Sequence, residues 1–309
     1  MEEPFSKGST KRTAVVTGAN KGIGLEICRQ LSSRGVLVVL TARDERRGTE
    51  AVEELRSSGL SDVLFHQLDV ADPSSVSSLA NFVKTQFGKL DILVNNAGIN
   101  GLEVDYQNII ASMREKQQKQ EDGIPSFMKI RELARETNEK AVECLNVNYY
   151  GVKSVTKALM PFLQLAQPPN IVNVSSTYGQ LKYIPGEIIR KQMGNVDEQT
   201  EERLDELLQS FLRDLKEKRL EENGWPTILS AYKVSKVAMS TYSRLLEEKY
   251  PTHRINCVCP GSVKTDITFN TGILPVEEGA KGLLMLALLP ADGSPTGLFY
   301  EQTNPSTFE

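Results

Sequence analysis

Short apolar runs alternate with helix-length segments through the first hundred residues, and this alternation constrains the fold more than any other feature. The apolar runs lie at 13–17, 36–41, 63–68 and 92–94. A strand buried on both faces has a continuous apolar sequence, and parallel strands need helical crossovers between them. We therefore expect an α/β fold: a Rossmann-type, doubly wound parallel sheet of about seven strands with helices on both faces.

The same alternation resumes in the second half of the chain. Further helices and strands are expected at 139–165, 171–174, 254–259, 277–289 and 298–300. Because the late strands continue the earlier pattern, a single domain over 11–301 explains the chain better than two domains. Residues 1–10 and 302–309 are expected to be tails.

Two insertions interrupt the pattern, at about 101–136 and 186–225. The first is polar. In the second, apolar residues between Leu204 and Leu215 recur at helical spacing after Thr200, a suitable N-cap, which predicts an amphipathic helix. We expect both insertions to lie over the active site.

A glycine-rich turn follows the first strand, with the sequence Gly18-Ala-Asn-Lys-Gly22-Ile-Gly24. Glycines allow a tight turn and let a pyrophosphate approach the start of the next helix, whose free N–H groups and dipole favour an anion. The spacing differs from Gly-x-Gly-x-x-Gly, and a plain tight turn is the alternative interpretation. The position directly after the first strand favours a dinucleotide site.

Charged residues near the end of the second strand indicate which dinucleotide binds. An acidic residue there would bind the adenosine ribose and select NAD, whereas an arginine accepts a 2′-phosphate. Arg43 at this position and Lys21 in the glycine turn both favour NADP(H). Asp44 argues for NAD, and a solvated Arg43 is the alternative.

Polar residues in later elements could carry chemistry. Tyr232 and Lys236 are one helical turn apart, so the ammonium would lower the pKa of the phenol and let it donate a proton. The same spacing also occurs on solvated helix faces. Ser175 and Ser176 end a strand, and because strand ends of a parallel sheet converge, Ser176 could meet Tyr232. Asn148 is polar in mid-helix, which indicates a water relay, a bridge to the backbone or a surface asparagine.

Composition excludes several classes of function. The chain has only two histidines, and its four cysteines lack metal-ligand spacing, so we expect no metal site and no histidine-based triad. A net charge of -4 offers no basic face to nucleic acid or to an anionic membrane. The sequence shows no membrane span or signal peptide, so we expect a cytoplasmic protein with reduced thiols.

Together, the motifs resemble the NADP-dependent type of the short-chain dehydrogenase/reductase family over roughly 11–300. In chain order they are the glycine turn, Asn95-Asn96-Ala97-Gly98, Asn148, Ser176, Tyr232-x-x-x-Lys236 and Pro260-Gly261. The chain looks most like the plant branch that contains salutaridine reductase and the menthone and neomenthol reductases. That branch shares the long insertions and the phrases Phe65-His-Gln-Leu-Asp69-Val and Asn256-Cys-Val-Cys-Pro-Gly261.

The resemblance implies roles for individual residues. Tyr232 would be the general acid that protonates a carbonyl oxygen, and Lys236 would lower its pKa and bind the nicotinamide ribose. Ser176 would hydrogen-bond the substrate oxygen, and Asn148 would support a proton relay. The implied cofactor site consists of Gly18, Asn20, Lys21, Gly22, Ile23, Gly24, Arg43, Asp69, Val70, Asn95, Ala97, Gly98, Tyr232, Lys236, Pro260, Gly261, Val263 and Thr265.

The resemblance also implies an NADPH-dependent carbonyl reductase acting on a hydrophobic cyclic ketone, either a salutaridine-type morphinan alkaloid or a menthone-type monoterpenoid. An enone double-bond reductase and a non-catalytic NADP(H)-sensing scaffold are the alternatives. Because the second insertion precedes the helix that tetrameric members use for pairing, we expect a monomer. The pocket walls are expected to come from Leu102, Val104, Tyr178, Leu181, Ile267 and Phe269.

Overall fold

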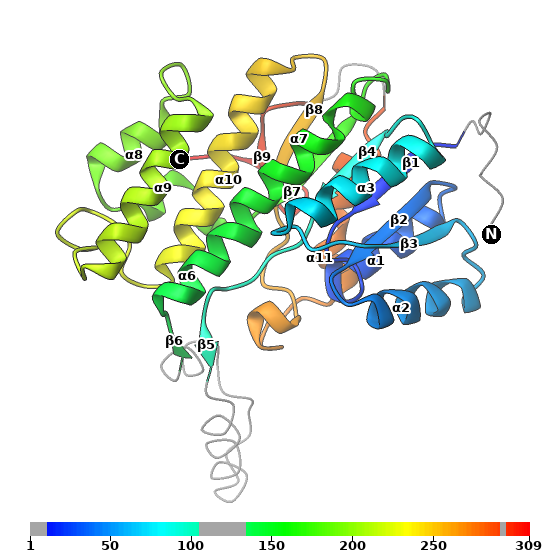
Figure 1. Cartoon of the computed structure of the whole chain (residues 1–309), viewed down its shortest axis with the longest axis horizontal. Helices are drawn as coiled ribbons and strands as arrows, with labels where there is room; N and C mark the ends of the chain where they lie inside the picture. Colours follow the sequence, from blue (N-terminus) through cyan, green and yellow to red (C-terminus); the bar gives the residue numbers. More distant parts are fainter. Residues whose placement is uncertain (1–10, 105–133, 291–294) are drawn as a thin grey trace, which may run out of the picture.

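In the computed structural model, which describes residues 11–104, 134–290 and 295–309, a sheet of eight strands forms the centre of the protein (Figure 1). In spatial order the strands are β3 (Val63–Gln67), β2 (Leu37–Ala42), β1 (Thr13–Val16), β4 (Ile92–Asn95), β7 (Asn170–Val174), β8 (Arg254–Cys259), β9 (Phe299–Glu301) and β10 (Asn304–Ser306). All neighbours pair in parallel except β9 and β10. The predicted doubly wound parallel sheet of about seven strands is confirmed.

The antiparallel edge strand β10 was not predicted, and its presence corrects the expectation that residues 302–309 form a tail. Its sequence, Asn-Pro-Ser, gives no strand signal, because asparagine and proline are depleted in strands. Proline is tolerated at a sheet edge, where one side of the strand makes no ladder hydrogen bonds. Beyond β10, the Phe308 ring packs against Phe299 with ring centroids 5.7 Å apart.

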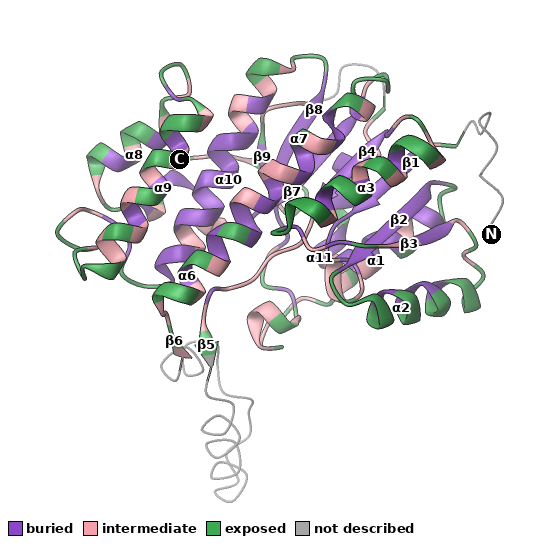
Figure 2. Ribbon diagram, viewed as in Figure 1, coloured by how far each residue is buried: buried purple, intermediate pink, exposed green. Residues whose placement is uncertain are grey.

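Helices cover both faces of the sheet, and the strands alternate their side chains between them. Val15 and Leu93 belong to the core on one face, whereas Val16 and Ile92 belong to the core on the other. Figure 2 shows the buried sheet between helices that are exposed on their outer sides. The first face carries α3 (Pro73–Gln86), α6 (Asn138–Leu145), α7 (Gly151–Leu163) and α10 (Ser230–Lys249), and the second carries α1 (Gly22–Ser32), α2 (Glu45–Ser57) and α11 (Val276–Ala287).

The connection order places a crevice at the carboxyl ends of the central strands. The chain proceeds outward from β1 through β2 to β3 and then returns to β4 on the other side of β1. The crossovers on the two sides of β1 therefore run in opposite directions, and they leave a gap above the ends of β1 and β4. In open α/β sheets, ligands bind at such switch points.

The single helix expected at 139–165 is in fact two helices. Between α6 and α7, residues Asn146–Tyr150 form a turn of π-helix. Such a turn inserts one extra residue into the helical ladder, and it redirects the side chains that follow. Apolar periodicity does not reveal it, because the π-helical turn is short and lies between two stretches of ordinary α-helix.

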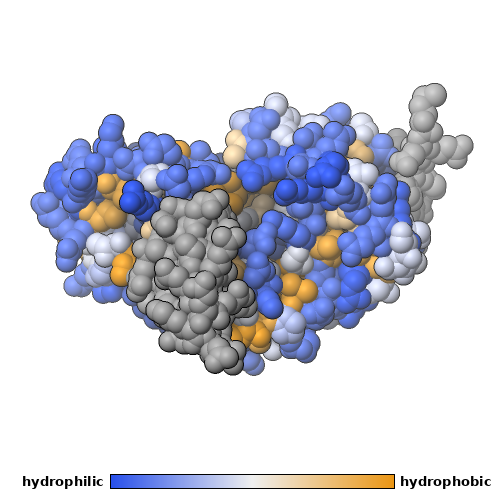
Figure 3. Space-filling model, turned by 90° about the horizontal axis from the view of Figure 1, so that it is seen from below, coloured by the Kyte–Doolittle hydropathy of each residue, from blue (hydrophilic) through white to orange (hydrophobic). Residues whose placement is uncertain are grey.

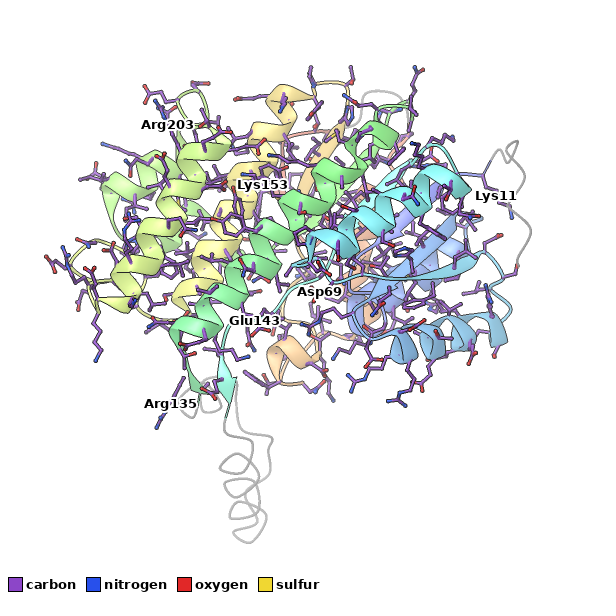
Figure 4. The ribbon with its side chains drawn as sticks, viewed as in Figure 1. Lys11, Asp69, Arg135, Glu143, Lys153 and Arg203 are labelled. Carbon is purple, nitrogen blue, oxygen red and sulfur yellow. The ribbon has the colours of Figure 1, made fainter. Side chains whose placement is uncertain are left out.

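The second insertion forms two helices, α8 (Glu187–Gly194) and α9 (Glu201–Lys216), beside α6 and α10. The predicted amphipathic helix is confirmed in α9: Thr200 caps it by accepting a hydrogen bond from the backbone N–H of Arg203, and Leu204 and Leu208 are fully buried. Its polar side meets α7, where the Lys153 ammonium lies 2.6 Å from the Asp205 carboxylate. Figure 4 labels Lys153 on α7.

Only the base of the first insertion lies within the described residues. Its outgoing and returning limbs pair as a short antiparallel ribbon of β5 (Glu103–Val104) and β6 (Ala134–Arg135), and the rest of the predicted 101–136 insertion lies outside the described residues. Figure 3 shows this end of the molecule, where hydrophilic side chains dominate and hydrophobic ones are exposed in small groups. None of the described helices is long and apolar enough to cross a membrane.

Candidate active site

A crevice of about 1280 Å³ opens where the carboxyl ends of the central strands meet. Its walls come from the turns after β1, β2, β3, β4, β7 and β8 and from the first turns of α1 and α10. These segments are distant in sequence, but the parallel sheet brings their ends to one edge. Of the residues predicted for the cofactor, those that line the crevice are Gly18, Asn20, Lys21, Gly22, Ile23, Gly24, Arg43, Asp69, Val70, Ala97, Gly98, Tyr232, Lys236, Pro260, Gly261, Val263 and Thr265.

The glycine turn has the form that an anion site needs. Gly18 and Gly22 have φ angles of 61° and 58°, a region that side chains with a Cβ rarely occupy. A Cβ on Gly18 would lie 2.9 Å from the Cα of Ala97. At the start of α1, the N-cap residue Lys21 makes no side-chain capping bond. Gly22, Ile23 and Gly24 line the crevice, so the uncapped N–H groups of the first turn of α1 are available there to bind a phosphate.

Asn95 is wrongly predicted as a cofactor residue, because it points into the core. Its side-chain amide donates hydrogen bonds to Thr156 Oγ1 at 3.1 Å and to Asn173 Oδ1 at 2.8 Å. The next residue, Asn96, holds the glycine turn instead, since its Nδ2 donates to the carbonyl oxygens of Thr17 and Gly18, each at 2.9 Å. Alternation along a strand sends adjacent residues to opposite sides, and β4 ends one residue later than we predicted.

The side chain of Asp44 lines the crevice, but it is engaged as the cap of the next helix. Its Oδ1 accepts a hydrogen bond of 2.9 Å from the backbone N–H of Arg47, which caps the start of α2. Arg43 and Arg47 both line the crevice at this corner. The sequence argument for NAD that rested on Asp44 is therefore weakened, and Arg47 is a further cation that we did not predict.

An ion pair joins the two sides of the crevice mouth. The Lys21 ammonium, in the glycine turn, pairs with the Asp266 carboxylate, in the loop after β8. Both side chains are more than half exposed, so the pair contributes little to stability. The Lys21 bond lowers the pKa of Asp266 below its ordinary value. This loop also brings Thr265 to within 3.3 Å of the place a Gly22 Cβ would take.

Tyr232, Ser176 and Lys236 meet at the inner end of the crevice. Ser176 and Tyr232 both line this end of the crevice, close enough for the Ser176 hydroxyl to lower the pKa of the phenol, and the Lys236 ammonium lies 5.8 Å from the centre of the Tyr232 ring. Lys236 donates a hydrogen bond of 2.7 Å to the carbonyl oxygen of Val174, so it is buried in a fixed position. Ser175 points the other way, with its Oγ 3.4 Å from Ser240 Oγ. The structure thus brings Ser176, rather than Ser175, to Tyr232.

Burial controls the ionisation of this pair. It raises the pKa of Tyr232, an effect that the hydrogen bond from Ser176 only partly offsets. Burial also lowers the pKa of Lys236 to about 8. The pKa of Tyr232 is therefore raised, whereas we expected the Lys236 spacing to lower it, because burial has the largest effect on this phenol.

Asn148 is fully buried in the π-helical turn, so the surface interpretation is wrong. Its side chain bridges two segments: Oδ1 accepts from the backbone N–H of Ile99 at 2.9 Å, and Nδ2 donates to Ser235 Oγ at 3.0 Å. Asn148 does not line the crevice itself. It fixes the loop after β4 against the helix that carries Tyr232.

The outer wall of the crevice is aromatic on one side. The Tyr178 ring makes edge-on contacts with Tyr183 and Tyr232, with centroids 5.0 Å and 6.3 Å apart. Tyr183 was not predicted, because residues Thr177–Gly179 and Leu181–Tyr183 form two 3-10 turns that fold the segment back. The predicted pocket residues that line the crevice are Leu102, Tyr178, Ile267 and Phe269.

The two remaining residues predicted for the pocket are Leu181, which lies elsewhere, and Val104, which stays a prediction. Leu181 is only 4% exposed and packs in the core, so its assignment to the pocket is wrong. The second of the 3-10 turns directs it away from the crevice, and its backbone N–H donates a hydrogen bond of 2.6 Å to the carbonyl oxygen of Phe308. Val104 lies in β5, but its side chain is outside the described part of the structure.

No group of three or more histidine, cysteine, aspartate or glutamate side chains converges as a metal site within residues 11–104, 134–290 and 295–309. The four cysteines are free and buried.

Comparison with known proteins identifies a family and several relatives that this chain resembles. The family model described as short chain dehydrogenase matches residues 12–187. The chain is 53% identical to short-chain dehydrogenase/reductase 1 of Saponaria officinalis, over 100% of both chains. It is 50% identical to (+)-neomenthol dehydrogenase of Arabidopsis thaliana, over 97% of this chain and 99% of the relative. The solved structure of salutaridine reductase from Papaver somniferum superimposes with a TM-score of 0.86 at 49% identity, covering 94% of this chain and 99% of that one.

Proposed function

Since the chain belongs to the short-chain dehydrogenase family, we propose that it is an NADPH-dependent reductase that converts a hydrophobic cyclic ketone into a secondary alcohol. The observation that carries this proposal is that Ser176, Tyr232 and Lys236 line one crevice together with the glycine turn, with the Lys236 ammonium beside the Tyr232 ring. A proton donor and a dinucleotide site thus share one cavity. That combination is what carbonyl reduction requires.

The residues of the crevice fit NADP(H). The N–H groups at the start of α1 would hold the pyrophosphate. Gly18 and Gly24 let this turn pack closely against the loop after β4, because a Cβ on Gly24 would lie 2.5 Å from Asn96 Nδ2. Arg43 and Lys21 would hold the 2′-phosphate, while Asp69 and Val70 would border the adenine. The bound cofactor supplies the hydride, and the protein's part is to orient it and to handle the proton.

The protein's own side chains carry out the proton transfer. Ser176 and Tyr232 both line the crevice and lie near one another, so a carbonyl oxygen bound between them would accept hydrogen bonds from both hydroxyls. As negative charge develops on that oxygen, the Tyr232 phenol donates its proton. Lys236 stabilises the phenolate that remains, because its ammonium is held nearby in a site that excludes water. Asn148 holds the surrounding backbone in place, and a proton relay through it stays a prediction.

The pocket favours a bulky apolar substrate. Leu102, Ile267 and Phe269 line it together with Tyr178 and Tyr183, and apolar walls with few polar groups are typical of sites for hydrophobic ligands. The names of the relatives point to a morphinan or a menthane skeleton. An enone double-bond reductase is less well supported, because Tyr232 and Ser176 are arranged to protonate an oxygen rather than a carbon.

The test is a panel of cyclic ketones and enones incubated with the protein and NADPH, with the products identified by chromatography. We expect alcohol formation from at least one ketone, with the enone double bond retained. Reduction of the double bond alone would favour the alternative activity. A lack of turnover despite tight NADPH binding would favour a sensing scaffold.

Ketone reduction should slow as the pH rises through about 8. Burial lowers the pKa of Lys236 to about 8, so above that pH the amine loses the charge that stabilises the developing phenolate. The raised pKa of Tyr232 keeps the phenol protonated over the same range, so it is not the group that titrates. Measuring kcat between about pH 6 and pH 10 checks this. In Lys236→Arg the fall in kcat at alkaline pH should disappear, because arginine stays charged, and the residual activity should be independent of pH. A wild-type kcat that stays constant up to about pH 10 would contradict this prediction.

We also propose that the protein is a monomer located in the cytoplasm. The α9 helix lies against α6 and α10, and ion pairs with Lys153 and Lys157 also join it to α7. The face of α10 that could pair with a second copy is therefore partly covered. Sedimentation should give a single species of one chain at all concentrations, and a stable dimer or tetramer would disprove it.

A further inference from the structure

The helix that carries Tyr232 begins without a cap of its own. Its N-cap residue, Leu229, has a left-handed backbone with φ of 51° and makes no side-chain capping bond. The Ser230 hydroxyl, although buried, has no hydrogen-bond partner in the described part of the chain. The N–H groups of a helix's first turn need partners from outside the helix. Tyr232 lies in that first turn, so whatever holds the turn also holds the phenol.

Glu136 provides the missing partners from a distant segment. Its two carboxylate oxygens accept hydrogen bonds from the backbone N–H groups of Ser230, at 3.0 Å, and Ala231, at 2.6 Å. Glu136 follows β6 directly, on the returning limb of the first insertion. A carboxylate at this position also interacts favourably with the helix dipole.

The outgoing limb of the same insertion contacts the opposite wall of the crevice. The Asn100 side-chain amide donates a hydrogen bond of 3.2 Å to the carbonyl oxygen of Ile267, in the loop after β8. The two limbs pair as the ribbon of β5 and β6, which projects from the end of the molecule beside α6 (Figure 1). The base of the insertion is thus bonded both to the substrate wall and to the start of α10.

We propose that Glu136 is a positioning residue for Tyr232: by fixing the first turn of α10, it holds the phenol against Ser176. This proposal rests on the function proposed above. The rest of α10 does not need Glu136 to form, because the helix continues to Lys249 and its residues from Val234 to Leu246 are largely buried against the sheet. Glu136 therefore decides where the first turn lies, rather than whether the helix exists.

The test compares Glu136→Ala and Glu136→Gln with the matched control Glu139→Gln, an exposed position on the first turn of α6. In Glu136→Ala we expect kcat for a ketone to fall about 10-fold, because a small displacement of the acid weakens proton transfer. The dissociation constant of NADPH should change by less than about twofold, since Glu136 does not line the cofactor crevice. Glu136→Gln keeps one acceptor oxygen, so its kcat should lie between those of Glu136→Ala and the wild type.

Hydrogen exchange and melting temperature complete the design. Amide exchange at Ser230 and Ala231 should accelerate in Glu136→Ala, while the melting temperature should stay close to that of Glu139→Gln. A wild-type kcat in Glu136→Ala would overturn the proposal, and so would equal losses of kcat and NADPH affinity, which indicate general unfolding. A wild-type protein that reduces no ketone would instead overturn the proposed function, and the role of Glu136 would fall with it.

Discussion

Tyr232→Phe should reduce no ketone at a useful rate, with kcat lowered by about 10²–10⁴-fold, the usual contribution of a positioned general acid. The substitution removes the phenol oxygen and keeps the ring that packs against Tyr178. The fold and the cofactor site should therefore be unchanged. Single-turnover oxidation of bound NADPH measures the loss directly, and fluorescence titration shows whether NADPH still binds.

Tyr183→Phe is the matched control for this experiment. It also removes a phenol oxygen from an aromatic side chain that lines the crevice, but Tyr183 contacts Tyr178 rather than Ser176. We expect its kcat to stay within about threefold of the wild type, since no proton passes through it. Equal turnover in Tyr232→Phe and the wild type would show that another group donates the proton.

Arg43→Ala should raise the dissociation constant of NADPH by about 10–100-fold, the effect of losing a charge-assisted contact with a phosphate. Arg43 is exposed at the end of β2 and lines the crevice, and the neighbouring Asp44 carboxylate is engaged at the start of α2. Binding of NADH, which lacks the 2′-phosphate, should hardly change. The preference for NADPH over NADH should therefore decrease, and isothermal titration with both cofactors measures it.

Arg46→Ala provides the control for charge alone. Arg46 is an exposed arginine on the first turn of the adjacent α2, where it pairs with Glu50 at 3.1 Å and does not line the crevice. Its loss should leave both dissociation constants near the wild-type values. If Arg43→Ala weakened NADH and NADPH equally, Arg43 would be a structural residue and not a reader of the 2′-phosphate.

The fold was predictable because its determinants are local. Each apolar run that forms a strand, and each N-cap such as Thr200, can be recognised within a few residues of sequence. The proximity of Ser176 and Tyr232 could also be predicted, because the carboxyl ends of parallel strands and the segments next to them lie at one edge of the sheet. The exceptions are elements whose sequences oppose their structure, such as β10 with its proline and the π-helical turn around Asn148.

Features of the site that depend on contacts between distant segments were not predictable. Nothing near Glu136 in the sequence indicates that it caps a helix more than ninety residues later, and nothing near Asn95 shows that Asn96 faces the glycine turn. The pKa of Tyr232 illustrates the same limit. Its spacing from Lys236 suggested a lowered value, but burial by the whole fold raises it.

The order of elements along the chain separates the adenosine half of the cofactor site from the two insertions. The turns that would hold the adenosine and the pyrophosphate follow β1, β2 and β3, whereas the β5–β6 ribbon and the α8–α9 insertion come later and pack outside the sheet. Sequence changes in those later segments leave the packing of the first strands intact. Selection for a new substrate can therefore act on the insertions while the adenosine site is retained, provided that Glu136, at the base of the first insertion, keeps its contact with α10.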